Sequence, residues 1–339
     1  MKYGFPFVFT VLLLIFACTD DIGIPPSEPQ NPVLLKISQE GNKISVVRKY
    51  VMTHDLDIIL GPCGGNNLVQ LQRIAYIPNN SDSLANTNNQ GPTYVSATDW
   101  VGPYWMSAIN NGNGNSGFTG GWHAYNGDFT GSPTARTSNV TVYVDGKAIK
   151  NIKNTVCQEA SVVVENFLQA GNTKEANGNG REVLKEIVTY HFRHDTMAVS
   201  VLSEALEDLN IEIYYGLQSC FGGRVRMFCA DSVFTCLTDG YNGTMARASS
   251  AECTMGDGHQ VLCFLDSIGL GAQNQYNKCK IDTNRQYCFT SPYGKTYFRL
   301  VGEVGLPMKK GETCYWSGGY IFKEEATNAT QKSYTGISH

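Results

Sequence analysis

The 339-residue sequence lacks the motifs that mark the commonest enzyme classes. It has no G-x-S-x-G, no P-loop and no H-E-x-x-H, which excludes the usual serine hydrolase, nucleotide-binding and metallopeptidase signatures. No C-x-x-C pair occurs, and the six histidines do not fall at ligand spacing from the cysteines. We therefore expect no metal site and no other cofactor.

Charge is also scarce, because only 17% of residues are charged and the net charge is −4. No stretch concentrates lysine and arginine into a basic stripe that would neutralise phosphates, so we expect no nucleic-acid partner. The sequence is instead rich in glycine (35), tyrosine (18) and phenylalanine (15). This composition favours strands and leaves little material for solvent-facing helices.

Long apolar runs are confined to the N-terminus, where Lys2 precedes GFPFVFTVLLLIFA. This run is too short for a mature transmembrane helix and matches a signal-peptide core, predicted to span residues 1–17. The letters IFAC, ending at Cys18, resemble a bacterial lipobox, and the following acidic pair resembles the export signal of surface lipoproteins in the Bacteroides group. We predict lipidation at Cys18 and an outer-membrane, surface-exposed location; the alternative is an ordinary secretory signal.

A proline-containing segment separates the predicted signal peptide from the rest of the chain. Residues 18–32 contain four prolines in a short polar segment, which predicts a stiff, extended tether. No second linker follows, so residues 33–325 are predicted to form a single β-sandwich domain. Residues 326–339 form a polar tail.

Alternation of apolar and polar residues predicts successive strands with short turns. The expected strands are Asn139–Val144, Ala160–Phe167, Val183–Phe192, Met197–Glu204, Asn210–Leu217, Val225–Ala230, Gln260–Leu265, Lys295–Val301 and Thr313–Phe322. The first ends in an Asp-Gly turn, which is a hairpin signal. We predict an all-β fold built as a large antiparallel β-sandwich.

The stretch from Asp99 to Asn126 holds three of the four tryptophans, one histidine and many glycines and asparagines. Indole rings can carry the C–H faces of a sugar while amides pair with its hydroxyls, so this stretch predicts a glycan site. Its candidate substrate-binding residues are Trp100, Trp105, Asn110, Asn111, Trp122 and Asn126. The alternative is a hairpin whose tryptophans pack beneath it.

His123 is the strongest candidate for proton transfer. Glycines precede it and a tyrosine follows it, so its imidazole is expected on an aromatic surface, where it can exchange a proton near neutral pH. The Tyr214–Tyr215 pair is expected to form the opposing wall. A histidine in a loop is more often only a hydrogen-bonding residue.

If Cys18 is lipidated, ten further cysteines remain, an even number that permits disulfides in an exported chain. Cys157, Cys263 and Cys314, however, lie in or beside apolar strand segments. There a free cysteine behaves as a small core residue.

Several segments resemble the galactose mutarotases (aldose epimerases). INNG at Ile109–Gly112 and TGGWHAYNG at Thr119–Gly127 are similar to that family's N-N-G and H-x-G-G region. The segments Glu186–Ser219 and Leu306–Phe322 are similar to its central strand pair and its last hairpin. The resemblance implies a mutarotase-like β-supersandwich. The family's second histidine is replaced here by Ile213-Tyr214-Tyr215, and no L-E-x-Q motif precedes the last hairpin.

Three classes of function remain open. The first is a surface lipoprotein that binds, and in one version processes, a glycan. The second is a polysaccharide lyase or other carbohydrate-active enzyme that uses His123, Tyr214 or Tyr215 for proton transfer, with Asn110, Asn111 or Arg136 near a uronate carboxylate. The third is a structural or adhesive lipoprotein without a sugar site. One concave face shared by Trp122, His123, Tyr214, Tyr215 and a carboxylate would favour the enzyme. Exposed tryptophans on a flat face would favour binding, and three buried tryptophans would favour the structural class.

Overall fold

A computed structural model describes part of the chain in atomic detail. It covers residues 34–88, 93–95, 99–110, 116–125, 131–175, 178–193, 195–220, 224–229, 238–239, 245–246, 248–254, 259–265, 287–290, 295–301 and 305–324. Internal contacts divide the chain into units Met1–Pro32 and Val33–His339, and all described residues belong to the second. The predicted signal peptide, Cys18, the tether and the polar tail lie outside the described residues.

The described residues form three antiparallel sheets. The ten-stranded sheet has the order β16 (Thr238–Asp239), β15 (Arg224–Cys229), β18 (Ala248–Thr254), β19 (His259–Leu265), β23 (Thr313–Glu324), β13 (Thr196–Ala205), β12 (Glu182–Arg193), β11 (Glu159–Gln169), β8 (Ala135–Val144) and β9 (Lys147–Ala148). The six-stranded sheet has the order β10 (Thr155–Cys157), β1 (Leu35–Glu40), β2 (Lys43–Val51), β3 (His54–Cys63), β4 (Leu68–Pro78) and β5 (Thr93–Val95).

The seven-stranded sheet carries the candidate site. Its order is β17 (Met245–Ala246), β20 (Tyr287–Thr290), β21 (Lys295–Val301), β14 (Leu209–Cys220), β6 (Tyr104–Ala108) and β7 (Gly117–Thr119), and β22 (Leu306–Met308) pairs with β14. The one helical element in the described ranges is a 3₁₀ turn, Gly171–Thr173. None of the helical structure in those ranges has the length and hydropathy to cross a membrane.

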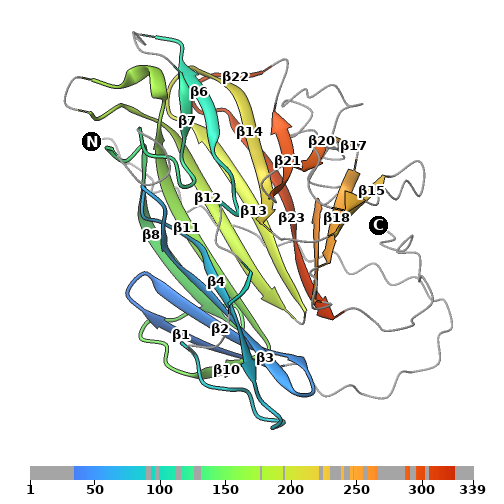
Figure 1. Cartoon of the computed structure of the whole chain (residues 1–339). Helices are drawn as coiled ribbons and strands as arrows, with labels where there is room; N and C mark the ends of the chain where they lie inside the picture. The colour runs from blue at the N-terminus through green and yellow to red at the C-terminus, as the bar shows by residue number, and fades with distance from the viewer. Residues whose placement is uncertain are drawn as a thin grey trace, which may run out of the picture. The chain divides into compact units, whose positions relative to one another are not determined.

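The ten-stranded sheet forms one layer of a sandwich, and Figure 1 shows β11, β12, β13 and β23 side by side in it. Burial alternates residue by residue along β11 and β12, as expected for a sheet with one covered face. The six-stranded sheet contacts this layer at β8, β11 and β23, and the seven-stranded sheet contacts it at β18 and β19. One continuous hydrophobic core joins all three sheets.

These strands confirm the predicted all-β antiparallel class. Lys295–Val301 has the predicted bounds, and the other predicted strands recur with ends shifted by a few residues. The Asp145-Gly146 turn after β8 has positive φ at both residues, 47° and 76°, as a tight hairpin turn requires.

A buried polar cluster links the ten-stranded sheet to the seven-stranded sheet. Glu186 on β12 is 4% exposed, and its carboxyl accepts hydrogen bonds from the Tyr104 hydroxyl (2.9 Å) and the Asn166 amide (3.0 Å). Tyr104 stacks on Tyr214, whose hydroxyl accepts a hydrogen bond from Trp316 Nε1 at 2.9 Å. Burial raises the pKa of Glu186, and the two hydrogen bonds only partly offset it.

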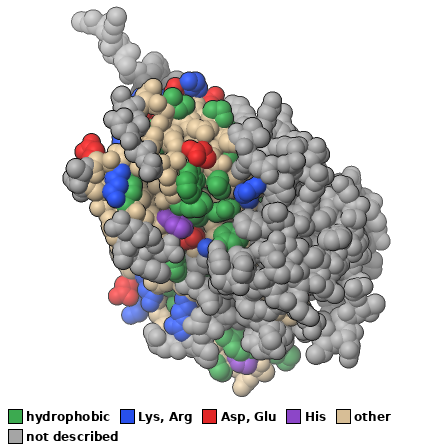
Figure 2. All heavy atoms as spheres, turned by 45° about the horizontal axis from the view of Figure 1, so that its top comes forward, with side chains coloured by type: hydrophobic (Ala, Val, Ile, Leu, Met, Phe, Trp, Pro, Cys, Tyr) green, Lys and Arg blue, Asp and Glu red, His purple; other side chains and the backbone are tan. Residues whose placement is uncertain are grey.

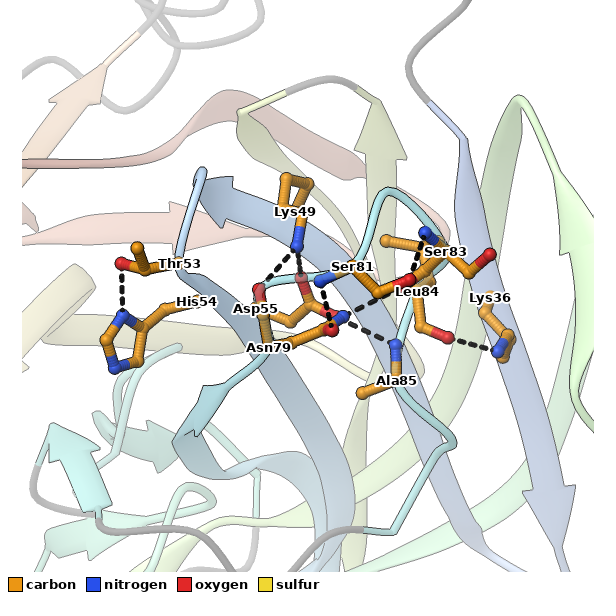
Figure 3. Close-up of polar contacts among 10 residues, drawn as sticks. All are labelled: Lys36, Lys49, Thr53, His54, Asp55, Asn79, Ser81, Ser83, Leu84 and Ala85. Carbon is orange, nitrogen blue, oxygen red and sulfur yellow. Dashed lines mark hydrogen bonds and ion pairs between the residues drawn. The ribbon is translucent and has the colours of Figure 1, made fainter.

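The outer face of the six-stranded sheet is covered by the segment after β4. Asp55 is fully buried there, and its carboxylate accepts hydrogen bonds from the Asn79 side chain (2.7 Å) and the Ala85 backbone (2.8 Å) (Figure 3). Lys49 forms an ion pair with Asp55 at 2.9 Å. The covering segment explains why β3 is buried along most of its length and shows no alternation.

Five cysteines of the described residues are packed as core side chains. The side chains of Cys63, Cys157, Cys253, Cys263 and Cys314 are all buried. This confirms the core role predicted for Cys157, Cys263 and Cys314. Burial raises the pKa of the Cys63 and Cys157 thiols to about 12.

Candidate functional site

Phe118 is the centre of a group of aromatic side chains on the seven-stranded sheet. Its ring centroid lies 5.0 Å from that of Trp105, 5.6 Å from that of Tyr215 and 5.4 Å from that of His123. A fourth ring, Tyr297, lies 5.0 Å from Tyr215. We call Trp105, Phe118, Tyr215 and Tyr297 the ring row.

Strand alternation places two rings of this row, Trp105 and Tyr215, on the outward face, whereas Tyr297 is 6% exposed. Along β6, Tyr104 and Met106 are buried in the core, whereas Trp105 between them is partly exposed. Along β14, Tyr214 is buried and Tyr215 is partly exposed. Figure 2 shows a face of the molecule where hydrophobic side chains, a histidine and charged side chains of both signs lie together.

Asp99 supplies a carboxylate directly beside the rings. Its Oδ2 atom lies 3.1 Å from Lys295 Nζ and 3.6 Å from His123 Nε2, and its Oδ1 accepts the Trp122 backbone N–H at 2.9 Å. The side chains of Asp99 and Lys295 are 6% and 12% exposed, whereas that of His123 is 25% exposed. Of these three, the imidazole is the group most open to a ligand.

The charge state of Asp99 follows from these contacts. Burial alone would raise the pKa of the carboxyl, but the contact with His123 and the positive charge of Lys295 outweigh it. The pKa of Asp99 is therefore lowered, and the group is ionised at neutral pH. An ionised carboxylate at Nε2 favours the proton on that nitrogen and fixes the orientation of the ring.

A buried amide holds the turn that carries His123. The Asn66 side chain donates to the backbone carbonyls of Gly121 (3.2 Å) and His123 (3.0 Å), and its oxygen accepts the Thr134 backbone N–H at 2.7 Å. Gly120 and Gly121 have φ of 73° and 50°, which suits glycine. The amide and the two glycines together set the position of the imidazole.

Trp122 packs against the turn that contains Gly64 and Gly65. A Cβ added at Gly64 would come within 2.6 Å of the Trp122 Cβ and Cγ atoms, so only glycine fits there. The Gly65 backbone N–H donates to the Trp122 carbonyl at 3.0 Å. The indole is partly exposed, although its Nε1 atom is buried.

Two predicted site residues occupy the core instead. Trp100 is 1% exposed and packs edge-on against Tyr320 at 4.9 Å, so its ring offers no face to a ligand. Tyr214 is 3% exposed, and burial raises the pKa of its hydroxyl well above the usual value. These positions differ from the predicted ones: the alternation of β14 turns Tyr214 inward, and Trp100, in the segment before β6, packs into the core against Tyr320.

Other predicted residues are engaged elsewhere or fall outside the described residues. Arg136 on β8 forms a bidentate pair with Glu182 at 2.7 and 3.0 Å. Asn110 is exposed at the end of β6, and its carbonyl accepts a hydrogen bond from Arg181. Asn111 and Asn126 lie outside the described residues.

Sequence reasoning missed Phe118, Asp99, Lys295 and Asn66. Phe118 and Asp99 lie within the stretch singled out for its tryptophans. Lys295 and Asn66 are distant in sequence, and no local pattern marks them. Within the described ranges, no three histidine, cysteine or acidic side chains gather closely enough to hold a metal ion.

No protein-family model and no curated protein matches the chain. Among solved structures, it is similar to a galactose 1-epimerase from Lactobacillus acidophilus NCFM, with 10% identity, a TM-score of 0.34 and coverage of 86% of this chain and 98% of that one. It is also similar to the galactosidase domain of the α-galactosidase-sucrose kinase AgaSK, with 11% identity and a TM-score of 0.40; 86% of this chain and 42% of that chain are covered. At these TM-scores neither likeness supports a conclusion about activity.

The arrangement combines two chemical capacities. Partly exposed rings bind apolar C–H surfaces, and an imidazole oriented by an ionised carboxylate exchanges protons. Of the groups whose clustering was predicted to favour an enzyme, His123 and Tyr215 both adjoin Phe118, and the buried Asp99 carboxylate contacts His123. Trp122 is partly exposed, and Tyr214 lies in the core.

Proposed function

We propose that this protein binds a carbohydrate on the ring row and that His123 contacts the bound sugar. The observation that carries the proposal is the position of Phe118, whose ring lies 5.0–5.6 Å from Trp105, Tyr215 and His123. All four side chains are partly exposed on one face. Rings beside a hydrogen-bonding imidazole match the alternating C–H and hydroxyl surfaces of a pyranose.

The charges of the site also support a sugar ligand. Asp99 pairs with Lys295 at 3.1 Å, so the two charges at the base of the site neutralise each other. A nucleic acid would require several uncompensated cations on this face. The rings instead favour a ligand held mainly by apolar contact and hydrogen bonds.

A second candidate is an enzyme that transfers a proton to or from the glycan, such as a polysaccharide lyase. The contact of Asp99 Oδ2 with His123 Nε2 at 3.6 Å favours it, because an oriented imidazole is the usual general base or acid. Tyr215 is the second proton-transfer candidate, since it is partly exposed and adjoins Phe118.

The cellular location belongs to the same proposal. A signal peptide over residues 1–17 and lipidation of Cys18 would place the domain on the outer surface of the outer membrane. The support for this is the sequence of the N-terminus alone. A surface position would give the ring row access to extracellular polysaccharides.

The test is a glycan array followed by product analysis, with the mature domain, two site variants and one control variant. Phe118→Ala should abolish retention of any glycan that the wild type binds, because it removes the central ring. His123→Ala should weaken binding modestly in a pure binder and should stop turnover with binding retained in an enzyme. Tyr143→Ala, a partly exposed tyrosine on β8, is the matched control. If the wild-type domain retains no glycan, the proposal fails and the structural or adhesive class remains.

A further inference from the structure

A β-bulge in β14 changes which side chains of this strand face outward. The register of β14 against β6 shifts between Ile211 and Ile213, so Glu212 is an extra residue without a partner on β6. Glu212 and Ile213 are consecutive and both partly exposed, which regular alternation does not produce. Because of the extra residue, Glu212 and Tyr215 are both partly exposed although they are three positions apart. Bulges of this kind often lie beside functional sites, where they redirect a side chain.

A hydrogen bond places the Glu212 carboxylate on the face that carries the rings. Its Oε1 atom accepts the Ser107 hydroxyl at 2.7 Å. Ser107 and Trp105 are two residues apart on β6, and both are partly exposed between buried neighbours, so they share the outward face. Their positions are about 7 Å apart along the strand. The carboxylate therefore lies on the outward face, beside Ser107.

Glu212 and His123 lie on opposite sides of the rings along the strand direction. The strands β7, β6 and β14 lie side by side (Figure 1). Phe118 pairs with Trp105, and β7 runs from there towards the start of β6. His123 forms an isolated bridge with Gly120, so the imidazole lies near the start of β6, whereas Glu212 lies near its end. A sugar on these rings therefore has an imidazole at one edge and a carboxylate at the other.

The Glu212 carboxylate keeps capacity for further hydrogen bonds. Its two oxygens offer about four acceptor positions, and Ser107 uses one of them. Within the part of the chain that the structure describes, no lysine, arginine or histidine forms an ion pair with Glu212. Sugar hydroxyls can donate to it, and hydrogen bonds to a charged acceptor are stronger than those between neutral groups. A second negative charge at the same place would instead be repelled.

We infer that Glu212 binds hydroxyl groups of the sugar on the rings and makes the site selective for a neutral sugar over a uronic acid. This inference rests on the proposed function. An acidic sugar would need a cation instead, and Arg299, opposite Tyr215 in register, lies on β21, across β14 from β6. The inference also bears on the second candidate function, because a polysaccharide lyase acts on a uronate.

The experiment compares sugars that differ only in the group at C6. The wild-type domain is titrated with three matched pairs of trisaccharides: β-1,4-linked glucose and glucuronic acid, β-1,4-linked mannose and mannuronic acid, and α-1,4-linked galactose and galacturonic acid. In a pair that binds, the neutral member should bind at least about tenfold more tightly. Equal affinity, or tighter binding of the acidic member, would overturn the inference and leave the proposed function intact. If no member of any pair binds, the inference fails, and a glycan retained on the array still supports the proposed function.

Variants test whether the selectivity comes from the charge of Glu212. Glu212→Gln keeps the shape of the side chain and an oxygen for Ser107, and circular dichroism checks that it is folded. It should weaken binding of the neutral member about tenfold and bring the affinities of the two members to within about threefold of each other. Glu204→Gln, at a partly exposed glutamate of β13 in the ten-stranded sheet, is the matched control and should change neither affinity. An unchanged ratio in Glu212→Gln would show that Glu212 only holds Ser107, and would overturn the inference.

Discussion

Asp99 and Lys295 lie 196 positions apart in sequence, yet their side chains meet at 3.1 Å. The pair joins the segment before β6 to the first residue of β21, and both side chains are almost fully buried. Removal of one partner from such a pair leaves an uncompensated charge in a dry environment. The position of His123 depends on the same carboxylate.

Asp99→Asn should therefore lower the free energy of unfolding by about 3–5 kcal/mol, as expected for breaking a buried ion pair. Chemical denaturation measures this change. Glu207→Gln, which breaks the more exposed pair with Arg181, is the control and should have little effect. The difference between wild type and Asp99→Asn should shrink in acid, because a lowered pKa gives stability that is lost as pH falls through the folded-state value. A difference that stays constant down to about pH 3 would contradict this account.

Glu186 should make the protein less stable as pH rises. Its pKa is raised in the folded state, so its contribution is complete below the usual value of 4.5 and is lost as pH rises through the folded-state pKa. Glu186→Gln cannot ionise and should flatten the pH dependence of unfolding above the usual carboxyl value of 4.5. Parallel pH profiles for the two proteins would show that Glu186 is not the titrating group.

Trp316 and Trp122 should respond differently to truncation. Trp316 is 1% exposed and donates a hydrogen bond to Tyr214, so Trp316→Ala should cost about 3–5 kcal/mol of stability. Trp122 is partly exposed and lies outside the ring row, so Trp122→Ala should cost less stability than Trp316→Ala and should weaken glycan binding less than Phe118→Ala. Calorimetry and glycan titration distinguish them. Unfolding of Trp122→Ala would instead assign that ring to the core.

Cys63 and Cys157 should resist alkylation in the folded protein. Their thiol pKa values of about 12 leave almost no thiolate at about pH 8, and both side chains are buried. Iodoacetamide followed by mass spectrometry should find both unmodified until guanidinium chloride is added. Rapid modification without denaturant would show that the core opens locally at these positions.

The N-terminal prediction has its own experiment. Cys18→Ser should release the protein from the membrane fraction, because the thiol is the expected lipid attachment site. Fractionation with immunoblotting measures this release. Continued membrane retention of the variant without a lipid would contradict lipidation at Cys18.

Much of the fold was predictable because alternation is a local signal. It located β8, the strands from β11 to β15, and β19, β21 and β23. It missed the six-stranded sheet, where β3 is buried on both faces and carries two aspartates that resemble surface residues. Both are fully buried, Asp55 beneath the segment after β4.

The site was predictable only in part. The predicted site residues Trp105, Tyr215 and His123 are partly exposed, but the choice between Tyr214 and Tyr215 depends on strand parity. The register of β14 shifts at this point, so parity cannot be read from the sequence. Lys295 could not be selected as a site residue from the sequence, because only the tertiary fold brings it close to Asp99.

The polar cluster around Glu186 also fixes the alignment of the ten-stranded sheet against the seven-stranded sheet. A shift of β12 by two residues would keep every apolar side chain facing inward, so alternation alone permits it. Such a shift would withdraw Glu186 from Tyr104 and Asn166 and leave its carboxyl among apolar side chains, at a high cost in free energy. The Glu186 carboxyl is therefore hydrogen-bonded in only one alignment of the two sheets. Through Tyr104 it also fixes the position of β6 and β14 along β12, and with it the position of the rings on their outer surface.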